Sequence, residues 1–161
     1  MSKRATFRAA VYVLPRRDDE ILLARRFNTG FGDGYFSLIA GHVEQPEFVR
    51  ACAVREADEE AGIAIDPADL TFAHILHRHT ADGLVYFDFF FTVTRWSGTP
   101  RIMEPDRCDG LCWVRPDALP ANTLPYVRHT VAQIFVHGAP FSEFQSRPLP
   151  YPPPEEGPPC S

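Results

Sequence analysis

A stretch of 23 residues, numbers 41–63, places the strongest constraint on how this chain can fold. It contains two basic and six acidic side chains, so its net charge is −4, while the net charge of the whole chain is −5. From Pro46 to Ala61 the sequence pattern is helical, Pro46 suits a first helical position, and Gly62 suits the position after the last helical residue. The sequence therefore predicts a strongly acidic helix over residues 46–61.

Three glutamates of this predicted helix lie on one side of it. At about 100° per residue, Glu56, Glu59 and Glu60 fall within an arc of about 100°. Like charges four residues apart destabilise a helix, so a compensating interaction is needed. Two explanations are open. The acidic side is either a solvated surface whose charges are screened, or a site for a divalent cation that takes carboxylate oxygens as ligands.

Length and composition limit the class of protein. The chain has 161 residues, of which 45% are hydrophobic and 23% charged, as in a single globular domain. Its net negative charge argues against a protein that binds the nucleic-acid backbone, which needs a basic face. The apolar stretch at residues 9–14 is too short for a signal sequence or a membrane span. We therefore expect a cytoplasmic protein that binds neither nucleic acid nor membranes.

The rest of the chain alternates predicted strands with one further helix. Strands are expected at residues 6–14, 20–27, 35–40, 70–80, 84–95 and 111–114, and a second helix at 125–137. A glycine-rich loop is expected at residues 28–34, and a hairpin turn at 81–83. This order predicts an α/β (α+β) domain with a mixed sheet over residues 1–146. Seven of the 16 prolines fall in residues 147–161, which we expect to form a tail outside the domain.

The acidic segment resembles the Nudix box, the signature of the Nudix (MutT-like) hydrolases, which is written G-x5-E-x7-R-E-U-x-E-E-x-G-U. The matching residues are Gly41, Glu47, Arg55, Glu56, Ala57, Glu59, Glu60, Gly62 and Ile63. Ala57 is smaller than the aliphatic residue that the pattern specifies, and Pro46 stands where many members have glycine. The resemblance implies the Nudix fold, a mixed β-sheet between helices. It also implies hydrolysis of a pyrophosphate bond in a nucleoside diphosphate-linked substrate.

The resemblance also implies a metal site. Glu56, Glu59 and Glu60 resemble the metal ligands of the family, and a backbone carbonyl of Ala40 or Gly41 is expected to join them. The expected cofactor is Mg²⁺, with Mn²⁺ as the alternative. A divalent cation on the phosphate oxygens neutralises their charge and lowers the pKa of a bound water.

Three further box and loop residues are expected to support catalysis. In the family, the residues corresponding to Arg55 and Glu47 form an internal salt bridge that holds the loop against the helix. The general base differs between family members and is either a box glutamate or a glutamate of a downstream loop. Glu56 and Glu104 are therefore the two candidates for the base here. The alternative interpretation of Glu104 is that it is a solvent-exposed acid of the loop.

Five residues are candidates for contacts with the substrate. Arg25 and Arg26 point to opposite faces of a strand, so at most one of them reaches the site and binds a phosphate. His42 follows the box glycine and either touches a phosphate or has a structural role. Asp88 either accepts hydrogen bonds from a base or ribose, with Tyr86 or Phe90 stacking beside it, or it lies at solvent or pairs with an Arg or His of a neighbouring strand. The opposite face of that strand is expected to be core: Val85, Phe87, Phe89, Phe91 and Val93.

The resemblance leaves more than one substrate open. The markers of ADP-ribose hydrolases and of dinucleoside polyphosphate hydrolases, a Pro and a Tyr soon after the box, are missing. The sequence therefore favours a nucleoside triphosphate, modified or not, that is hydrolysed to a monophosphate, and ADP-ribose or a nucleotide sugar is the alternative. A non-catalytic sensor or interaction module is the second function class, although such modules often lose box carboxylates. Because Nudix domains frequently dimerise, a homodimer is also expected.

Overall fold

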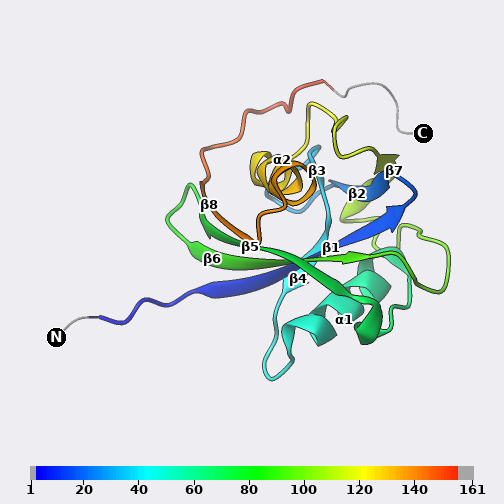
Figure 1. Cartoon of the computed structure of the whole chain (residues 1–161). Helices are drawn as coiled ribbons and strands as arrows, with labels where there is room; N and C mark the ends of the chain where they lie inside the picture. Colours follow the sequence, from blue (N-terminus) through cyan, green and yellow to red (C-terminus); the bar gives the residue numbers. More distant parts are fainter. Residues whose placement is uncertain (1–2, 156–161) are drawn as a thin grey trace.

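The computed structural model describes residues 3–155. Within them, eight strands form one mixed sheet, and the helices α1 (Val49–Ala61) and α2 (Pro125–Ala132) lie on opposite sides of it (Figure 1). The strands are β1 (Arg8–Arg17), β2 (Glu20–Arg26), β3 (Phe36–Ser37), β4 (Ile39–His42), β5 (Thr71–His79), β6 (Val85–Val93), β7 (Cys108–Val114) and β8 (Phe141–Gln145). The predicted α+β architecture, a mixed sheet between helices, is confirmed.

Strand β1 connects the parts of the sheet. It pairs in parallel with β6, with Arg8 opposite Tyr86, and antiparallel with β4, with Ala10 opposite His42. Its last residues form a hairpin with β2, while β5 and β8 extend the sheet beyond β6. The start of β1 therefore lies next to the end of β4, where the acidic segment begins.

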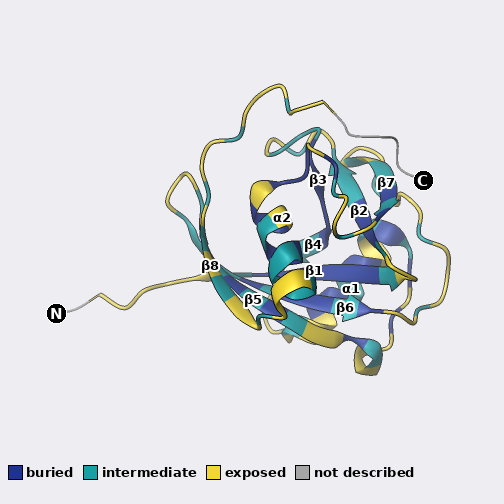
Figure 2. Ribbon diagram, turned by 45° about the horizontal axis from the view of Figure 1, so that its top comes forward, coloured by how far each residue is buried: buried dark blue, intermediate teal, exposed yellow. Residues whose placement is uncertain are grey.

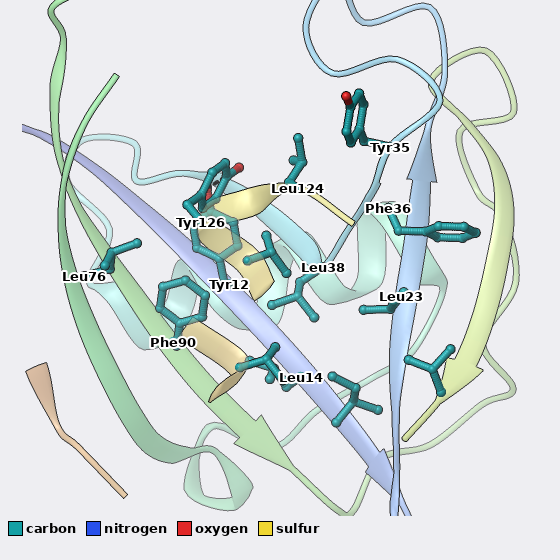
Figure 3. Packing of buried hydrophobic residues seen from close by; sticks show 14 of the residues in the cluster. Tyr12, Leu14, Leu23, Tyr35, Phe36, Leu38, Leu76, Phe90, Leu124 and Tyr126 are labelled. Carbon is teal, nitrogen blue, oxygen red and sulfur yellow. Dashed lines mark hydrogen bonds between the residues drawn. The ribbon is translucent and has the colours of Figure 1, made fainter. Parts of the chain in front are cut away.

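The two faces of β1 contribute to two separate cores. Val11 and Val13 pack with the helix residues Cys52, Ala53, Ala57 and Ala61 on the α1 side. Tyr12 and Leu14 pack on the α2 side, together with a second set that includes Phe90, Leu124, Tyr126, Val127 and Val131 (Figure 3). Figure 2 shows β1 as buried along most of its length. A strand that is buried on both faces needs an almost continuous apolar run, and residues 9–14 supply it.

Several strand bounds differ from the prediction. β1 continues through Pro15 to Arg17, so the turn before β2 has only two residues, Asp18 and Asp19. Asp18 has a φ of 54°, which suits a two-residue hairpin turn. The predicted strand at 35–40 is divided into two short strands, β3 and β4. The backbone of Phe36 in β3 also forms hydrogen bonds with residues 122–124.

Helix α1 begins at Val49, three residues later than predicted. The Glu47 N–H donates to the Glu44 carbonyl, and the Glu47 side chain accepts from the Glu44 N–H, so residues 44–47 form a turn instead. The predicted helix end is confirmed. Gly62 has a φ of 64°, and its N–H donates to the Asp58 carbonyl, which is the left-handed ending that glycine favours.

The second helix and the segment after it also differ from the prediction. After α2 the chain continues as a wider π-helical turn, η2 (Gln133–His137), and then forms β8, which the sequence analysis missed. β8 pairs in parallel with β5, and the buried His74 ring contacts the Ser142 hydroxyl at 2.7 Å. Beyond β8, Leu149 packs against the α2-side core and the Tyr35 hydroxyl donates to the Pro150 carbonyl. No helix in the described part of the chain is long and apolar enough to cross a membrane.

Candidate active site

The end of β4 lies directly against helix α1. A Cβ atom at Gly41 would overlap the carboxylate of Glu56, so any other residue there would displace this carboxylate. The Cys52 thiol, one turn earlier on the helix, lies 3.4 Å from the His42 carbonyl. Glycine is therefore required here because it brings the Glu56 carboxylate against the backbone of β4.

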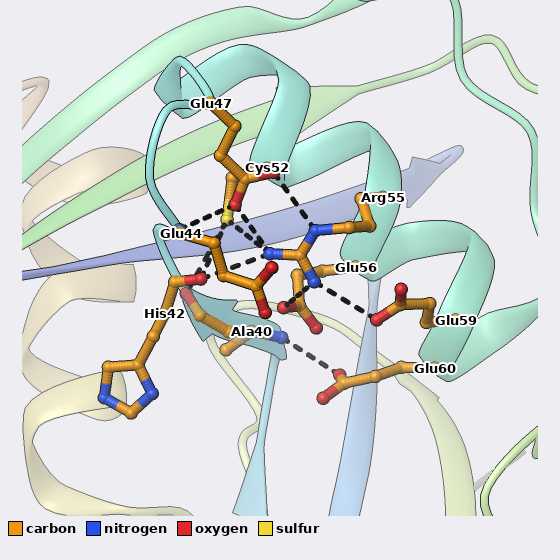
Figure 4. Close-up of polar contacts among 10 residues, drawn as sticks. Ala40, His42, Glu44, Glu47, Cys52, Arg55, Glu56, Glu59 and Glu60 are labelled. Carbon is orange, nitrogen blue, oxygen red and sulfur yellow. Dashed lines mark hydrogen bonds and ion pairs between the residues drawn. The ribbon is translucent and has the colours of Figure 1, made fainter.

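Arg55 is the centre of the polar contacts on this side of α1 (Figure 4). It holds Glu47 with two hydrogen bonds, of 2.7 and 3.1 Å, and it donates to Glu56 at 2.8 Å and to Glu59 at 3.2 Å. A further bond joins it to the His42 carbonyl at 3.2 Å. The hydrogen bonds from Arg55 lower the pKa of Glu47 to about 2, so this carboxylate stays charged. The geometry therefore places Arg55 and Glu47 as the clamp between loop and helix that the resemblance implies.

Glu60 is half-buried and lies beside the buried Glu56. It accepts one hydrogen bond, of 3.0 Å, from the Ala40 N–H. Burial, together with the negative charges of Glu56 and Glu104, raises its pKa to about 8, and the hydrogen bond from Ala40 and the positive charge of Arg26 oppose this shift. Burial also raises the pKa of Glu56. Charged carboxylates in such surroundings are stabilised by a nearby cation.

Glu104 lies close enough to interact with these carboxylates. Its loop is held at the end of α1, because the Arg101 N–H donates to the Ala61 carbonyl at 3.0 Å and the Met103 N–H to the Glu60 carbonyl at 3.4 Å. The Glu104 charge raises the pKa of both Glu56 and Glu60, and its side chain is half-buried. The two candidate bases, Glu56 and Glu104, therefore belong to one electrostatic cluster.

The oxygen ligands that Mg²⁺ prefers are present at this site. Within residues 3–155 no three His, Cys, Asp or Glu side chains stand together as a metal site. Arg55 holds the carboxylates of Glu56 and Glu59, and Glu60 accepts a hydrogen bond from the Ala40 N–H. The residues therefore fit a divalent cation. It would replace Arg55 as the partner of the Glu56 and Glu59 carboxylates, while Arg55 would remain paired with Glu47.

The two adjacent arginines of β2 have different surroundings. Arg25 donates to Asp109 at 2.7 Å. Arg26 bonds inside the glycine-rich loop, to the Phe31 carbonyl at 2.7 Å and to the Thr29 hydroxyl at 3.0 Å. Because its charge also lowers the pKa of Glu60, Arg26 is the arginine of this pair that lies near the carboxylates.

The other predicted substrate contacts differ in burial, because His42 is exposed whereas Tyr86 and Asp88 are buried. His42 Nε2 lies 3.1 Å from the Tyr86 hydroxyl, next to Gly41. Asp88, by contrast, is fully buried and holds Arg78 through bonds of 2.6 and 3.2 Å. This geometry favours the ion-pair interpretation of Asp88 over a contact with substrate.

The prediction that the core face of β6 is the face of Phe87 was incomplete, because both faces of this strand contribute buried residues. The face of Tyr86, Asp88 and Phe90 is buried under α2, whereas Phe87 on the opposite face is only partly buried. The sequence analysis also missed Arg78, whose guanidinium lies 4.6 Å from the Tyr86 ring centroid and 4.2 Å from that of Tyr126. Arg78 stands at a strand position that faces the core. This placement could have identified it as the partner of Asp88, because a buried acid needs such a partner.

Replacing Arg55 by lysine should lower kcat/KM by about 10- to 100-fold, the usual effect of disturbing residues that orient metal ligands. A lysine cannot hold Glu47 with two bonds and reach Glu56 and Glu59 as well. Steady-state kinetics would measure the effect. The matched control is Arg50→Lys on the same helix, because Arg50 donates to the Pro67 and Leu70 carbonyls, away from the carboxylates. Equal losses in both variants would contradict a role for Arg55 in the site.

An acidic helix held against the end of a central strand, within a mixed sheet between helices, defines a Nudix-type fold. The family model for the NUDIX domain matches residues 6–134. The chain therefore belongs to the Nudix family, and the predicted family of hydrolases is confirmed.

Solved structures agree with this assignment. The chain is similar to a MutT NUDIX hydrolase from Burkholderia pseudomallei, with a TM-score of 0.74 and 29% identity, over 81% of this chain and 99% of that one. It is also similar to the ORF135 protein of E. coli, with a TM-score of 0.55 and 27% identity, over 69% of this chain and 75% of that one.

Two curated relatives share a name. The NAD-capped RNA hydrolase NudC of Stutzerimonas stutzeri is 31% identical over 133 residues, which cover 79% of this chain and 42% of the relative. The protein of the same name from Pseudomonas aeruginosa is 45% identical over 56 residues, which cover 35% of this chain and 19% of the relative. The chain thus spans well under half the length of these relatives.

Proposed function

We propose that this chain hydrolyses a pyrophosphate bond in a nucleoside diphosphate-linked substrate with the help of Mg²⁺. The observation that carries the proposal is the cluster of Glu56, Glu60 and Glu104 beside the Arg55–Glu47 clamp. Burial and mutual repulsion make this cluster unfavourable without a cation. The match to the Nudix family gives independent support.

The protein residues would divide the work as follows. Glu56, Glu59, Glu60 and the Gly41 carbonyl would hold the cation, which would neutralise phosphate charge and make a bound water more acidic. The Arg55–Glu47 pair fixes the loop that follows Gly41 and β4.

Other residues would bind the substrate and take up the proton. Arg26 would bind a phosphate oxygen with its guanidinium group. Either Glu56 or Glu104 would accept the proton of the attacking water, because both are carboxylates near the same position.

Two substrate types deserve the first assays. The sequence favours a nucleoside triphosphate giving a monophosphate. The name of the curated relatives, NAD-capped RNA hydrolase, favours a substrate in which a diphosphate joins two nucleosides. Both contain the bond that the proposed reaction breaks, so a single screen can compare them.

A chromatographic screen for substrate loss over nucleoside triphosphates, oxidised nucleotides, dinucleotides and nucleotide sugars should find turnover that requires Mg²⁺ or Mn²⁺. Product chromatography should show a nucleoside monophosphate. Absence of turnover on every substrate with both metals would contradict the proposal and favour a non-catalytic module.

The variants Glu56→Gln and Glu104→Gln should separate the two candidate bases. Removing a general base typically costs about 10²- to 10⁴-fold in kcat. If Glu104 is the base, Glu104→Gln should lower kcat by that factor and leave the apparent Mg²⁺ affinity unchanged. If Glu56 is the base, Glu56→Gln should lower kcat and weaken Mg²⁺ binding together. Metal titrations of the rate would measure both quantities.

A further inference from the structure

The described part of the proline-rich tail, residues 147–155, passes over the α2 side of the sheet (Figure 1). Leu149 packs against the α2-side core. The carbonyl of the next residue, Pro150, accepts a hydrogen bond of 2.9 Å from the hydroxyl of the buried Tyr35. None of the roles assigned above to the carboxylates, the cation or the substrate involves this segment.

The tail also meets the glycine-rich loop at its last residue, Gly34. A Cβ atom at Gly34 would lie 2.9 Å from the Cγ atom of Pro153, which is closer than side-chain atoms normally come. Gly34 has a φ of 83°, a conformation that glycine adopts readily and other residues rarely do. The Pro153 ring therefore lies directly against the backbone of Gly34, and the tail contacts two adjacent residues, Gly34 and Tyr35, just before β3.

Gly34 and Tyr35 are the backbone partners of Arg26 at the end of β2. The Arg26 N–H donates to the Tyr35 carbonyl at 2.9 Å, and the Gly34 N–H donates to the Arg26 carbonyl at 2.8 Å. The Arg26 side chain also bonds inside this loop, and its charge acts on Glu60. Contacts that fix Gly34 and Tyr35 therefore also fix the backbone that carries the Arg26 guanidinium beside the carboxylate cluster.

The loop at residues 28–34 is rich in glycine, so it has more conformational freedom to lose than most loops and depends on outside contacts to keep one conformation. Its three glycines, Gly30, Gly32 and Gly34, all have positive φ. The Asn122 side chain supplies one outside contact, because it donates to the Gly34 carbonyl at 2.8 Å. The tail supplies its contacts to Gly34 and Tyr35 from a segment whose own prolines restrict its backbone. A stiff segment is well suited to hold a flexible one.

We propose that this tail positions Arg26 for the proposed reaction. Its contacts with Gly34 and Tyr35 hold the glycine-rich loop in one conformation, and this conformation places the Arg26 guanidinium where it binds a substrate phosphate. The proposal rests on the proposed hydrolysis and assigns Tyr35 and Pro153 as positioning residues, because each acts through Arg26. A guanidinium that is held in place before binding loses less conformational freedom on binding, so loss of the tail contacts should weaken phosphate binding.

Hydrogen exchange of the metal-free protein, followed by NMR, tests whether the tail holds the loop. Tyr35→Phe removes the hydrogen bond to Pro150, and Pro153→Ala removes the ring that lies against Gly34. Each variant should speed the exchange of the Gly34 and Arg26 amides at least about threefold and leave the amides of α1 unchanged, because the loop opens locally. Unchanged exchange of these two amides in either variant would overturn the proposal, whether or not any substrate is hydrolysed.

Matched control variants are Tyr151→Phe and Pro154→Ala in the same tail. The Tyr151 side chain is 89% exposed, and Pro154 is exposed as well, so these changes remove the same chemical groups away from the loop. Both variants should leave the exchange rates unchanged. Equally fast exchange of the Gly34 and Arg26 amides in the controls would trace the effect to the stiffness of the tail as a whole and overturn the role of its two contacts.

Calorimetry with inorganic pyrophosphate and Mg²⁺ tests whether the tail acts through Arg26. Tyr35→Phe should weaken pyrophosphate binding about three- to tenfold, the usual effect of losing one hydrogen bond, and Arg26→Gln should weaken it more. In the double variant, Tyr35→Phe should add no further loss, because the group that it positions is gone. A loss of the same size in both backgrounds, or no loss in the single variants, would overturn the link from the tail to Arg26.

Steady-state kinetics separates failure of this proposal from failure of the proposed reaction. With a nucleotide that the screen shows to be hydrolysed, Tyr35→Phe should raise KM by the same factor and leave kcat and the apparent Mg²⁺ affinity unchanged, because Arg26 binds substrate and transition state alike. A lower kcat with an unchanged KM would overturn the positioning role. A protein that hydrolyses no nucleotide, but shows the faster loop exchange and the non-additive pyrophosphate binding, would retain the role of the tail and lose the proposed reaction.

Discussion

Replacing Glu60 by glutamine is expected to lower kcat/KM by about 1,000-fold, which corresponds to roughly 4 kcal/mol of transition-state stabilisation. Glutamine keeps the shape of the side chain and an oxygen that accepts from the Ala40 N–H. It removes the negative charge that a divalent cation needs. The loss should therefore fall on metal binding and turnover and leave the fold intact.

Thermal unfolding with and without Mg²⁺ should separate these effects. Burial raises the pKa of Glu60 to about 8, so the surroundings disfavour its charged form and the metal-free variant should be no less stable than the unchanged protein. Mg²⁺ should raise the Tm of the unchanged protein, because it binds the folded state. It should not raise the Tm of Glu60→Gln.

A control for Glu60→Gln is available on the same helix. Asp58 is an exposed acid of α1, so Asp58→Asn changes the charge of the helix by the same amount. It should retain the activity and the Mg²⁺-dependent rise in Tm. A Glu60→Gln protein with more than a tenth of the original kcat/KM would remove Glu60 from the proposed metal ligands.

The sequence was most informative where a local pattern has a single structural solution. The end of α1 at Gly62 needs only a left-handed residue after the helix, and the Arg55–Glu47 contact joins two residues eight positions apart. The first follows from chain-local geometry, and the second was implied by the resemblance to the Nudix box. The box pattern therefore predicted most of the carboxylate cluster.

Features that depend on distant partners could not be predicted in the same way. β8 forms because the polar Ser142 meets the buried His74 and because β5 leaves an open edge, and neither fact is visible in residues 141–145. Phe7 likewise contacts the rings of Phe87 on β6 and His77 on β5. Only the parallel pairing of β1 with β6 brings these segments together.

Asp88 shows how the structure distinguishes two alternatives that the sequence left open. Its carboxylate and the Arg78 guanidinium are almost completely buried and joined by bonds of 2.6 and 3.2 Å. Asp88→Ala would leave the arginine charge unpaired in the core. We expect the free energy of unfolding to fall by about 3–5 kcal/mol, as for other broken buried ion pairs. Urea unfolding would measure this loss.

The double variant Arg78→Met, Asp88→Leu tests whether Asp88 also contacts the substrate. Apolar residues of similar size remove both charges together, so most of the stability lost in Asp88→Ala should return. If Asp88 serves only as the partner of Arg78, kcat/KM of the double variant should stay within about threefold of the original, a difference of roughly 0.6 kcal/mol. A stable double variant with kcat/KM reduced by a hundredfold would instead show that the Asp88 carboxylate binds a base or ribose, which the ion-pair interpretation excludes.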